Sequence, residues 1–189
     1  MKKIFLLTLT FVMLGLNAQY LEMGNSLVNF GAGMGTYMGS GNGYSSAIPP
    51  LYFTYEYMIN DKISVGPAAA YHTSKYEMSM PTGFGETLSV EYDFSYLHFG
   101  AVGNYHFYNE GNIDAYGGII LGYTKVSVDV SGSATDGDDN LSSSLTLDSS
   151  GFLYGAQVGG RYFFNDFLAF NLEVGYGISI VRGGLTIKF

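Results

Sequence analysis

The strongest constraint on the fold is a strict alternation of side chains near the end of the chain. Between Phe167 and Ile178, large apolar residues occupy every second position, and alanine, asparagine, glutamate and glycine fill the positions between them. Successive side chains of a β-strand point to opposite faces of the sheet. The segment therefore predicts a strand with one large apolar face and one face of small or polar residues.

Seven other segments of similar length repeat this alternation. The eight segments cover 28–35, 51–57, 63–72, 97–107, 113–123, 152–164, 167–178 and 181–189. The connections between them are tight polar turns at 59–62, 108–112 and 165–166, long stretches at 37–47, 77–88 and 130–148, and a short one near 179–180. This order predicts an antiparallel meander with tight turns at one end and mainly long loops at the other. The loop at 130–148 is rich in Ser, Gly and Asp and is expected to be mobile.

The polarity of the two faces decides between two kinds of eight-stranded barrel. A soluble barrel needs its apolar face inward, but residues such as Asn171, Glu173 and Gly175 are too small or too polar to fill an apolar core. A narrow barrel can close around them when its outer surface faces lipid, and closure leaves no unpaired strand edge in hydrocarbon. Only 13% of the residues are charged, against about 25% in soluble domains. We therefore predict an all-β fold, an eight-stranded antiparallel up-and-down transmembrane β-barrel.

Tyrosine and phenylalanine gather near the ends of the predicted strands. On the turn side they are Tyr57, Tyr105, Phe107, Tyr108, Tyr162, Phe164 and Phe167, and on the loop side Tyr37, Tyr44, Tyr71, Tyr76, Tyr92 and Tyr123. Aromatic rings are enriched where a membrane protein crosses the interface between hydrocarbon and water. These residues predict two interfacial belts.

The first residues have the pattern of an export signal. A basic start at Lys2 and Lys3 precedes an apolar run from 4 to 16, and Ala18 is a small residue directly before Gln19. We expect 1–18 to be a signal peptide, cleaved between Ala18 and Gln19, and 19–189 to be the barrel domain. The absence of cysteine excludes disulfides, thiol catalysis and a lipoprotein anchor, and a net charge of −8 does not suit a nucleic-acid partner.

The predicted strands and the last segment, 183–189, resemble small OmpA/OmpX-like outer-membrane β-barrel proteins. The most specific element is the final strand, in which apolar residues alternate up to Phe189. The resemblance implies an outer membrane of a Gram-negative-type bacterium, contact with its lipid and lipopolysaccharide, and recognition of Phe189 by the barrel-assembly machinery. It also implies a structural or surface-interaction role in membrane integrity, adhesion or loop-mediated binding of an extracellular ligand, with no enzymatic activity and no cofactor.

The inward faces carry polar and charged residues that need partners in a narrow lumen. They are Glu56, His72, His98, His106, Asp114, Gln157, Arg161, Glu173 and Lys188. We expect Arg161 to pair with Glu173, and Lys188 with Glu56, in an ion-pair network similar to that of OmpA-like barrels. The alternative is that the lumen forms a narrow pore for small solutes.

Two further chemistries involve His72. With Ser74 two residues later and Glu77 and Glu91 nearby, it has the residue types of an acyl-transfer site. Lipid A-modifying hydrolases of the outer membrane resemble this locally, although Lys75 departs from their motif. His72 and His98 also stand at similar heights on neighbouring strands, but two histidines without a third ligand more often form a hydrogen-bonded pair than a metal site.

Two other motifs match only in part. Asp136, Asp138 and Asn140 have the spacing of the first ligands of a calcium loop, but Leu141 and Leu147 replace the required glycine and glutamate. The glycines at 31, 33 and 35 are followed by Thr36 and by no helical pattern, which does not suit a dinucleotide site. We expect these glycines to line the inner face of a narrow barrel.

Overall fold

The computed structural model describes residues 21–37, 43–81, 87–136 and 139–189, and these form eight β-strands. The strands are β1 (Ser26–Met34), β2 (Tyr44–Asn60), β3 (Ile63–Pro81), β4 (Thr87–Glu110), β5 (Ile113–Asp136), β6 (Asp139–Phe163), β7 (Leu168–Tyr176) and β8 (Val181–Lys188). The predicted all-β fold of eight strands is confirmed. The predicted signal peptide, with Ala18 and Gln19, lies outside the described residues. Within the described residues, no helix has the length and apolar character needed to cross a bilayer.

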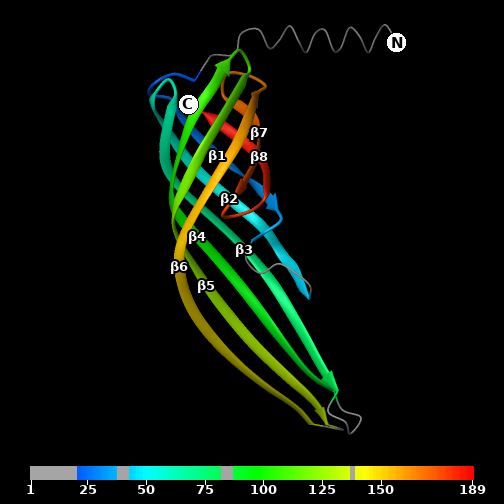
Figure 1. Cartoon of the computed structure of the whole chain (residues 1–189). Coiled ribbons are helices and arrows are strands. Elements are labelled where there is room, and N and C mark those ends of the chain that lie inside the picture. The colour runs from blue at the N-terminus through cyan, green and yellow to red at the C-terminus, as the bar shows by residue number, and fades with distance from the viewer. Residues whose placement is uncertain (1–20, 38–42, 82–86, 137–138) are drawn as a thin grey trace, which may run out of the picture.

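The sheet closes on itself. Each strand pairs antiparallel with the next one along the chain, and β1 also pairs with β8, with Gly31 opposite Gly184 at the seam. Beyond the last residue of β8, the backbone of Phe189 exchanges two hydrogen bonds with Ser26, at 2.8 and 3.0 Å. The up-and-down order gives a closed barrel, with the first described residue, Leu21, and the C-terminal Phe189 on the tight-turn side of the wall (Figure 1).

The barrel wall has its apolar side chains outside and its polar side chains inside. Phe170, Leu172 and Val174 are 44%, 50% and 55% exposed, whereas Ala169 and Asn171 between them are buried. The same alternation runs around the whole wall, and exposed aromatic residues cluster near both of its rims. This polarity is the reverse of that of a soluble barrel.

The strands β3, β4, β5 and β6 extend far beyond the others on the long-loop side (Figure 1). The long loops predicted at 77–88 and 130–148 are largely wrong, because β3 continues to Pro81, β4 starts at Thr87, β5 continues to Asp136 and β6 starts at Asp139. Alternating apolar residues such as Val126, Val128 and Val130 sustain strand pairing there, although the many Ser, Gly and Asp residues suggested an irregular, mobile loop. We call this part the protruding sheet, and it comprises residues 73–81, 87–96, 125–136 and 139–151.

The predicted aromatic belt on the loop side is wrong in part, because three of its tyrosines lie beyond the rim of the barrel wall. Tyr76 and Tyr92 lie on the face of the protruding sheet that continues the lumen side of the wall, and Tyr44 of β2 packs beside them. The ring centroid of Tyr76 is 4.9 Å from that of Tyr44 and 6.2 Å from that of Tyr92. Tyr71 and Tyr123 point outward from the wall and are exposed. The strands are longer than expected, so the first three tyrosines stand beyond the rim.

The alternation predicted up to Ile178 ends two residues earlier. β7 stops at Tyr176, and Gly177 adopts a positive φ of 119°, a conformation that favours glycine. This turn reverses the direction of the next side chain, and Ile178 is 3% exposed inside the barrel rather than outside it.

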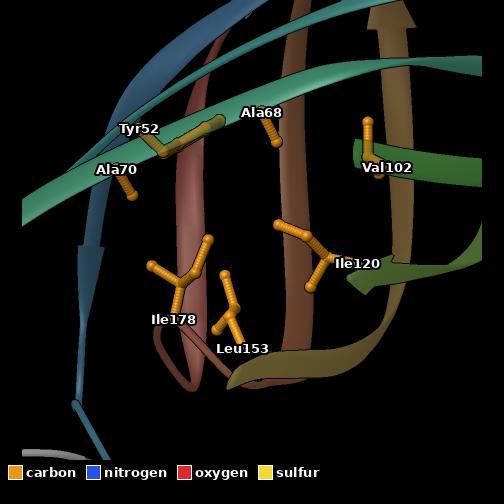
Figure 2. Packing of buried hydrophobic residues seen from close by; sticks show 7 residues of the cluster. All are labelled: Tyr52, Ala68, Ala70, Val102, Ile120, Leu153 and Ile178. Carbon is orange, nitrogen blue, oxygen red and sulfur yellow. The ribbon is translucent and has the colours of Figure 1, made fainter. Parts of the chain in front are cut away.

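The lumen is filled in layers. Near the long-strand end it holds an apolar cluster whose side chains point toward one another (Figure 2): Tyr52, Ala68, Ala70, Val102, Ile120, Leu153 and Ile178. At the tight-turn end a second apolar cluster contains Leu21, Leu27, Met58, Phe163 and Ala169. Charged and polar residues occupy the level between the two clusters.

Candidate functional site

The polar layer is centred on Arg161 of β6, whose side chain is completely buried. Its guanidinium donates from Nη2 to Glu56 Oε1 at 2.6 Å and from Nη1 to Asp114 Oδ2 at 2.8 Å. The same group lies over the ring of Tyr116, 4.1 Å from its centroid. One cation therefore joins two buried carboxylates from strands on different sides of the lumen.

Each carboxylate oxygen of this pair has a donor. Glu56 Oε2 accepts from Ser64 Oγ at 2.6 Å and from Asn104 Nδ2 at 2.9 Å. Asp114 Oδ1 lies 2.7 Å from His106 Nδ1. Satisfied oxygens are what make a buried charge tolerable, because an unpaired one carries a large desolvation cost.

A second buried ion pair stands beside the first. Arg182 of β8 pairs with Glu173 of β7 at 2.7 Å, and also donates to Gln157 Oε1. Tyr116 donates its hydroxyl to Glu173 at 2.7 Å, so this ring contacts both ion pairs. Gln157 Nε2 in turn donates to Asn104 Oδ1 at 3.0 Å, and Asn104 donates to Glu56. These hydrogen bonds form a second connection between the two ion pairs.

Every strand of the barrel contributes to this set, which we call the lumen network. Its members are Asn29 (β1), Tyr52 and Glu56 (β2), Ser64 (β3), Asn104 and His106 (β4), Asp114 and Tyr116 (β5), Gln157 and Arg161 (β6), Asn171 and Glu173 (β7), and Arg182 and Thr186 (β8). A network of this extent ties the eight strands together across the lumen as well as around the wall.

The ion pairs differ from the two pairings expected from the sequence. Arg161 pairs with Asp114, which faces it directly in the β5–β6 register, instead of with Glu173. Glu173 pairs with Arg182, its direct opposite in the β7–β8 register. Direct cross-strand neighbours are closer than diagonal ones, which explains these two pairs. The second partner of Arg161, Glu56, lies across the lumen on β2.

Lys188 also lies apart from its expected partner. In the registers of β1 with its two neighbours, Leu27 stands between Glu56 and Lys188, and Leu27 is fully buried. The Lys188 ammonium lies 5.8 Å from the centre of the Phe163 ring, at the tight-turn end.

The predicted set of inward polar residues did not include Arg182. The alternation of β8 places Arg182 on the inner face, and this alternation is the signal that would have identified Arg182 as a member of the lumen network.

His72 and His98 form a stacked pair at the long-strand end of the lumen. His72 Nδ1 and His98 Nε2 are 3.3 Å apart, and His98 Nδ1 lies 2.8 Å from Thr124 Oγ1. The His72 ring also stacks on Tyr96, with centroids 4.4 Å apart and an angle of 8°. The described residues contain no group of three or more His, Asp or Glu side chains placed to hold a metal ion.

The residues of the acyl-transfer hypothesis are not brought together. His72 and Ser74 are buried on the lumen side of β3, whereas Glu91 is on the other side of the sheet, paired with Lys75 at 2.5 Å. Glu77, opposite Glu91 in register, shares that outer face. The possible calcium ligands cannot be placed in the same way: Asp138 lies outside the described residues, as do the side chains of Asp136 and Asn140.

A comparison with solved structures bears on this architecture. The outer membrane protein OprG of Pseudomonas aeruginosa matches with a TM-score of 0.51 and 17% identity, over 92% of this chain and 99% of that one. The chain has the fold of an eight-stranded outer-membrane β-barrel protein. Two others match with lower TM-scores: the attachment invasion locus protein Ail of Yersinia pestis (0.49, 13% identity, 88% of this chain and 99% of that one) and the N-terminal β-barrel domain of Pseudomonas aeruginosa OprF (0.40, 13% identity, 90% and 100%). No family model and no curated protein sequence matches the chain.

In this outer-membrane β-barrel fold, the protruding sheet inverts the polarity of the wall. Its outer face carries charged side chains: Lys75, Glu77, Glu91, Asp93, Lys125, Asp129 and Asp148. Hydrogen bonds to Glu91 and Asp93 raise the pKa of Lys75, and hydrogen bonds from Ser127 and Lys125 lower the pKa of Asp148. Lys75 and Asp148 therefore stay charged throughout the neutral range.

The inner face of the protruding sheet is apolar and aromatic. Tyr92, Phe94 and Tyr96 follow one another along β4 with nearly parallel rings, at centroid distances of 6.4 and 6.3 Å. On the same face, Val128 and Val130 of β5 separate these rings from Leu147 and Leu145 of β6, which are 53% and 59% exposed. The polarity changes where the long strands leave the barrel wall, so the two parts are suited to different surroundings.

Proposed function

We propose that the protein is an integral outer-membrane barrel with a sealed lumen, which acts at the cell surface in membrane integrity, adhesion or binding of an extracellular ligand. The observation that carries this proposal is the reversed polarity of the wall, which exposes leucine, valine and phenylalanine outward while Arg161 and Glu56 are buried. Apolar side chains over an entire closed surface are stable in lipid and unfavourable in water. The polar outer face of the protruding sheet then belongs outside the membrane.

The height of the apolar band supports this location. On β5 it runs from Ile113 at the tight turn to Tyr123 at the far rim, both of which are exposed. A rise of about 3.3 Å per residue and a tilt of about 40° give a band of about 25 Å, which is the height of the apolar band of outer-membrane barrels.

The proposal includes the partners of such a protein. The apolar band would contact lipid acyl chains, and the rim with Tyr123 would contact lipopolysaccharide. Residues 1–18 would direct export and be removed after Ala18, and Phe189, which is 68% exposed, would serve as the signal for the barrel-assembly machinery. We propose neither catalysis nor a cofactor, since His72 and Ser74 face the lumen and the carboxylates of their hypothetical site lie on the opposite face.

Cell fractionation and gel mobility test the location. The protein expressed in a Gram-negative host should be found in the outer-membrane fraction, and an unboiled sample should migrate faster than a boiled one because the closed barrel stays compact in detergent. A variant lacking 1–18 should remain in the cytoplasm. Recovery of the full chain in the soluble periplasmic fraction, with one mobility before and after boiling, would contradict the proposal.

Conductance measurements test the sealed lumen against the alternative of a narrow pore. Two apolar clusters enclose the lumen network, and eight strands leave an interior that side chains can fill. We therefore expect no channel steps from refolded protein in planar bilayers, in which an open porin serves as the positive control. Reproducible steps whose size changes in an Arg182→Gln variant would establish the pore instead.

A further inference from the structure

Residues 21–25 cross the tight-turn mouth of the barrel. They lead into β1, yet the backbone of Leu21 is bonded to Asn109 near the end of β4, three places away from β1 in the closed ring. The side chain of Leu21 is 1% exposed, and it belongs to the apolar cluster whose other members stand on β1, β2, β6 and β7. A side chain packed among residues of so many strands lies within the mouth rather than on its rim. We call residues 21–25 the strap.

Asn109 holds the strap by its backbone. Its Oδ1 atom accepts from the Leu21 N–H at 3.1 Å, and its Nδ2 atom donates to the Leu21 carbonyl oxygen at 2.7 Å. One side chain therefore satisfies both main-chain groups of Leu21, as the backbone of a neighbouring strand would. Buried main-chain groups without partners are costly, so the position of Leu21 in the mouth depends on Asn109.

The other attachments of the strap are weaker than those of a wall strand. The Met23 N–H donates to Asp61 Oδ1 and the Gly24 N–H donates to the Met58 carbonyl oxygen, both at 2.9 Å, but the side chain of Met23 is 69% exposed. Gly24 has a positive φ of 93° where the strap turns toward β1. A short segment with one buried side chain opens at a lower free energy than strands that are paired on both sides. The strap can therefore open while the wall stays closed.

Opening of the strap would lead to the lumen network. A cavity of about 450 Å³ beside the strap has Leu21, Asn109 and His106 in its lining. His106 lies 2.7 Å from Asp114, which accepts from Arg161 at 2.8 Å. The strap thus stands between solvent on the tight-turn side and a buried group of charges. The apolar cluster at the long-strand end closes the other side of the lumen independently.

We propose that residues 21–25 act as a strap that opens on its own, with Asn109 as its latch and Gly24 as its hinge. When the strap opens, water and small solutes from the tight-turn side reach the lumen network, while the apolar cluster around Ile120 keeps the long-strand end closed. In the orientation of the proposed function, the tight-turn mouth faces the periplasm. The inference deepens that function and rests on it, because it makes the lumen accessible from the periplasm alone.

Thiol labelling at the two ends of the lumen tests this directly. The chain has no cysteine, so a single introduced cysteine reports on one position. Ala169→Cys probes the apolar cluster beneath the strap, and Ala70→Cys is the matched probe in the cluster at the long-strand end. Each protein is placed in phosphatidylcholine nanodiscs, which leave both mouths open to solvent, and treated with a trimethylammonium methanethiosulfonate reagent. With an unaltered strap, both cysteines should react about a hundredfold more slowly than in the urea-unfolded chain.

An isosteric change of the latch should open one end only. Asn109→Asp keeps the acceptor for the Leu21 N–H but sets a carboxylate oxygen against the Leu21 carbonyl. It should speed labelling of Ala169→Cys on the order of tenfold and leave Ala70→Cys unchanged, since one hydrogen bond is replaced by a repulsive contact.

Asn165→Asp is the matched control at another tight turn. Asn165 Oδ1 only accepts, from the N–H groups of Phe167 and Leu168, so this variant keeps its bonds and should label like the unaltered protein. Folding of each variant is checked by the mobility shift between unboiled and boiled samples. Equal labelling of Ala169→Cys with Asn109 and with Asn109→Asp would overturn the strap. Fast labelling of Ala70→Cys in the unaltered background would count against the sealed lumen of the proposed function instead.

Hydrogen exchange of the unaltered protein covers the case in which Asn109→Asp does not fold. The Leu21 amide should exchange more slowly than in the unfolded chain, because it is bonded in the mouth. It should exchange faster than the amide of Phe30, which is paired on both sides in the wall and opens only with the barrel. A Leu21 amide without protection, or one protected as strongly as that of Phe30, would contradict a strap that opens on its own.

Discussion

An Arg161→Met variant is expected to lose about 3–5 kcal/mol of unfolding free energy, because the substitution leaves two buried carboxylates without their cation. Arg161 donates to Glu56 and Asp114, and its side chain is 0% exposed. The chain contains no tryptophan, so urea unfolding in lipid vesicles is followed by circular dichroism and by the fraction of fast-migrating, folded protein on unboiled gels.

Two further variants make this result specific. Lys75→Met breaks ion pairs with Glu91 and Asp93 on the exposed outer face of the protruding sheet, where solvent screens the charges, and should leave the unfolding midpoint unchanged. Combining Arg161→Met with Glu56→Gln and Asp114→Asn removes the uncompensated charges and should restore much of the loss. If Arg161→Met unfolds like the unaltered protein, the lumen network does not stabilise the barrel.

A single methyl group at Gly184 is expected to disturb closure of the barrel. A Cβ there would lie 2.1 Å from the carbonyl oxygen of Phe30 and 2.7 Å from Cα of Gly31, both on β1 across the seam. Backbone atoms cannot give way as a flexible side chain can, so Gly184→Ala should cost at least about 1–3 kcal/mol of stability and slow refolding. The readout is the folded fraction of unboiled protein after refolding into detergent micelles.

Gly183 provides the matched control at the neighbouring position. Its Cβ would point to the outer face, where the nearest atom, Cδ1 of Leu172, is 3.7 Å away, an ordinary contact. Gly183→Ala should therefore refold like the unaltered chain. Equal behaviour of the two variants would mean that the β1–β8 seam is not closed as tightly as the structure has it.

The barrel itself could be predicted from sequence because each wall strand has one lipid-type face and one lumen face. In β7 this alternation covers Leu168 to Tyr176 without a break, and its failure at Ile178 depends on the backbone of Gly177. The length of β5 and β6 was missed for a different reason. Their outer residues beyond the wall are mainly Ser, Thr, Asp and Lys, as in an exposed loop, and the period of a strand is carried by the valines at 126, 128 and 130 and the leucines at 145 and 147.

The ion pairs of the lumen could not be assigned from alternation alone. Alternation places Arg161, Glu173 and Arg182 on the inner face, but it does not say which residues stand opposite one another. Register depends on the connection between strands, and β5 and β6 are joined only at the far end of the protruding sheet, by a hairpin whose length the sequence did not define. For Arg161, whose predicted pair with Glu173 was wrong, one partner, Asp114, lies directly across the ladder, and the other, Glu56, lies across the lumen on β2.

The spread of the lumen network over all eight strands has a mechanical consequence. A force applied to the N-terminal end of the barrel domain, for example in an atomic force microscope, would normally unfold a β-barrel one hairpin at a time. Here the first hairpin to leave would take with it Asn29 and Glu56, and so break the bonds that hold Arg161 on the far side of the barrel. The force needed for unfolding should therefore be greatest when this first hairpin detaches, and the remaining strands should then unfold together.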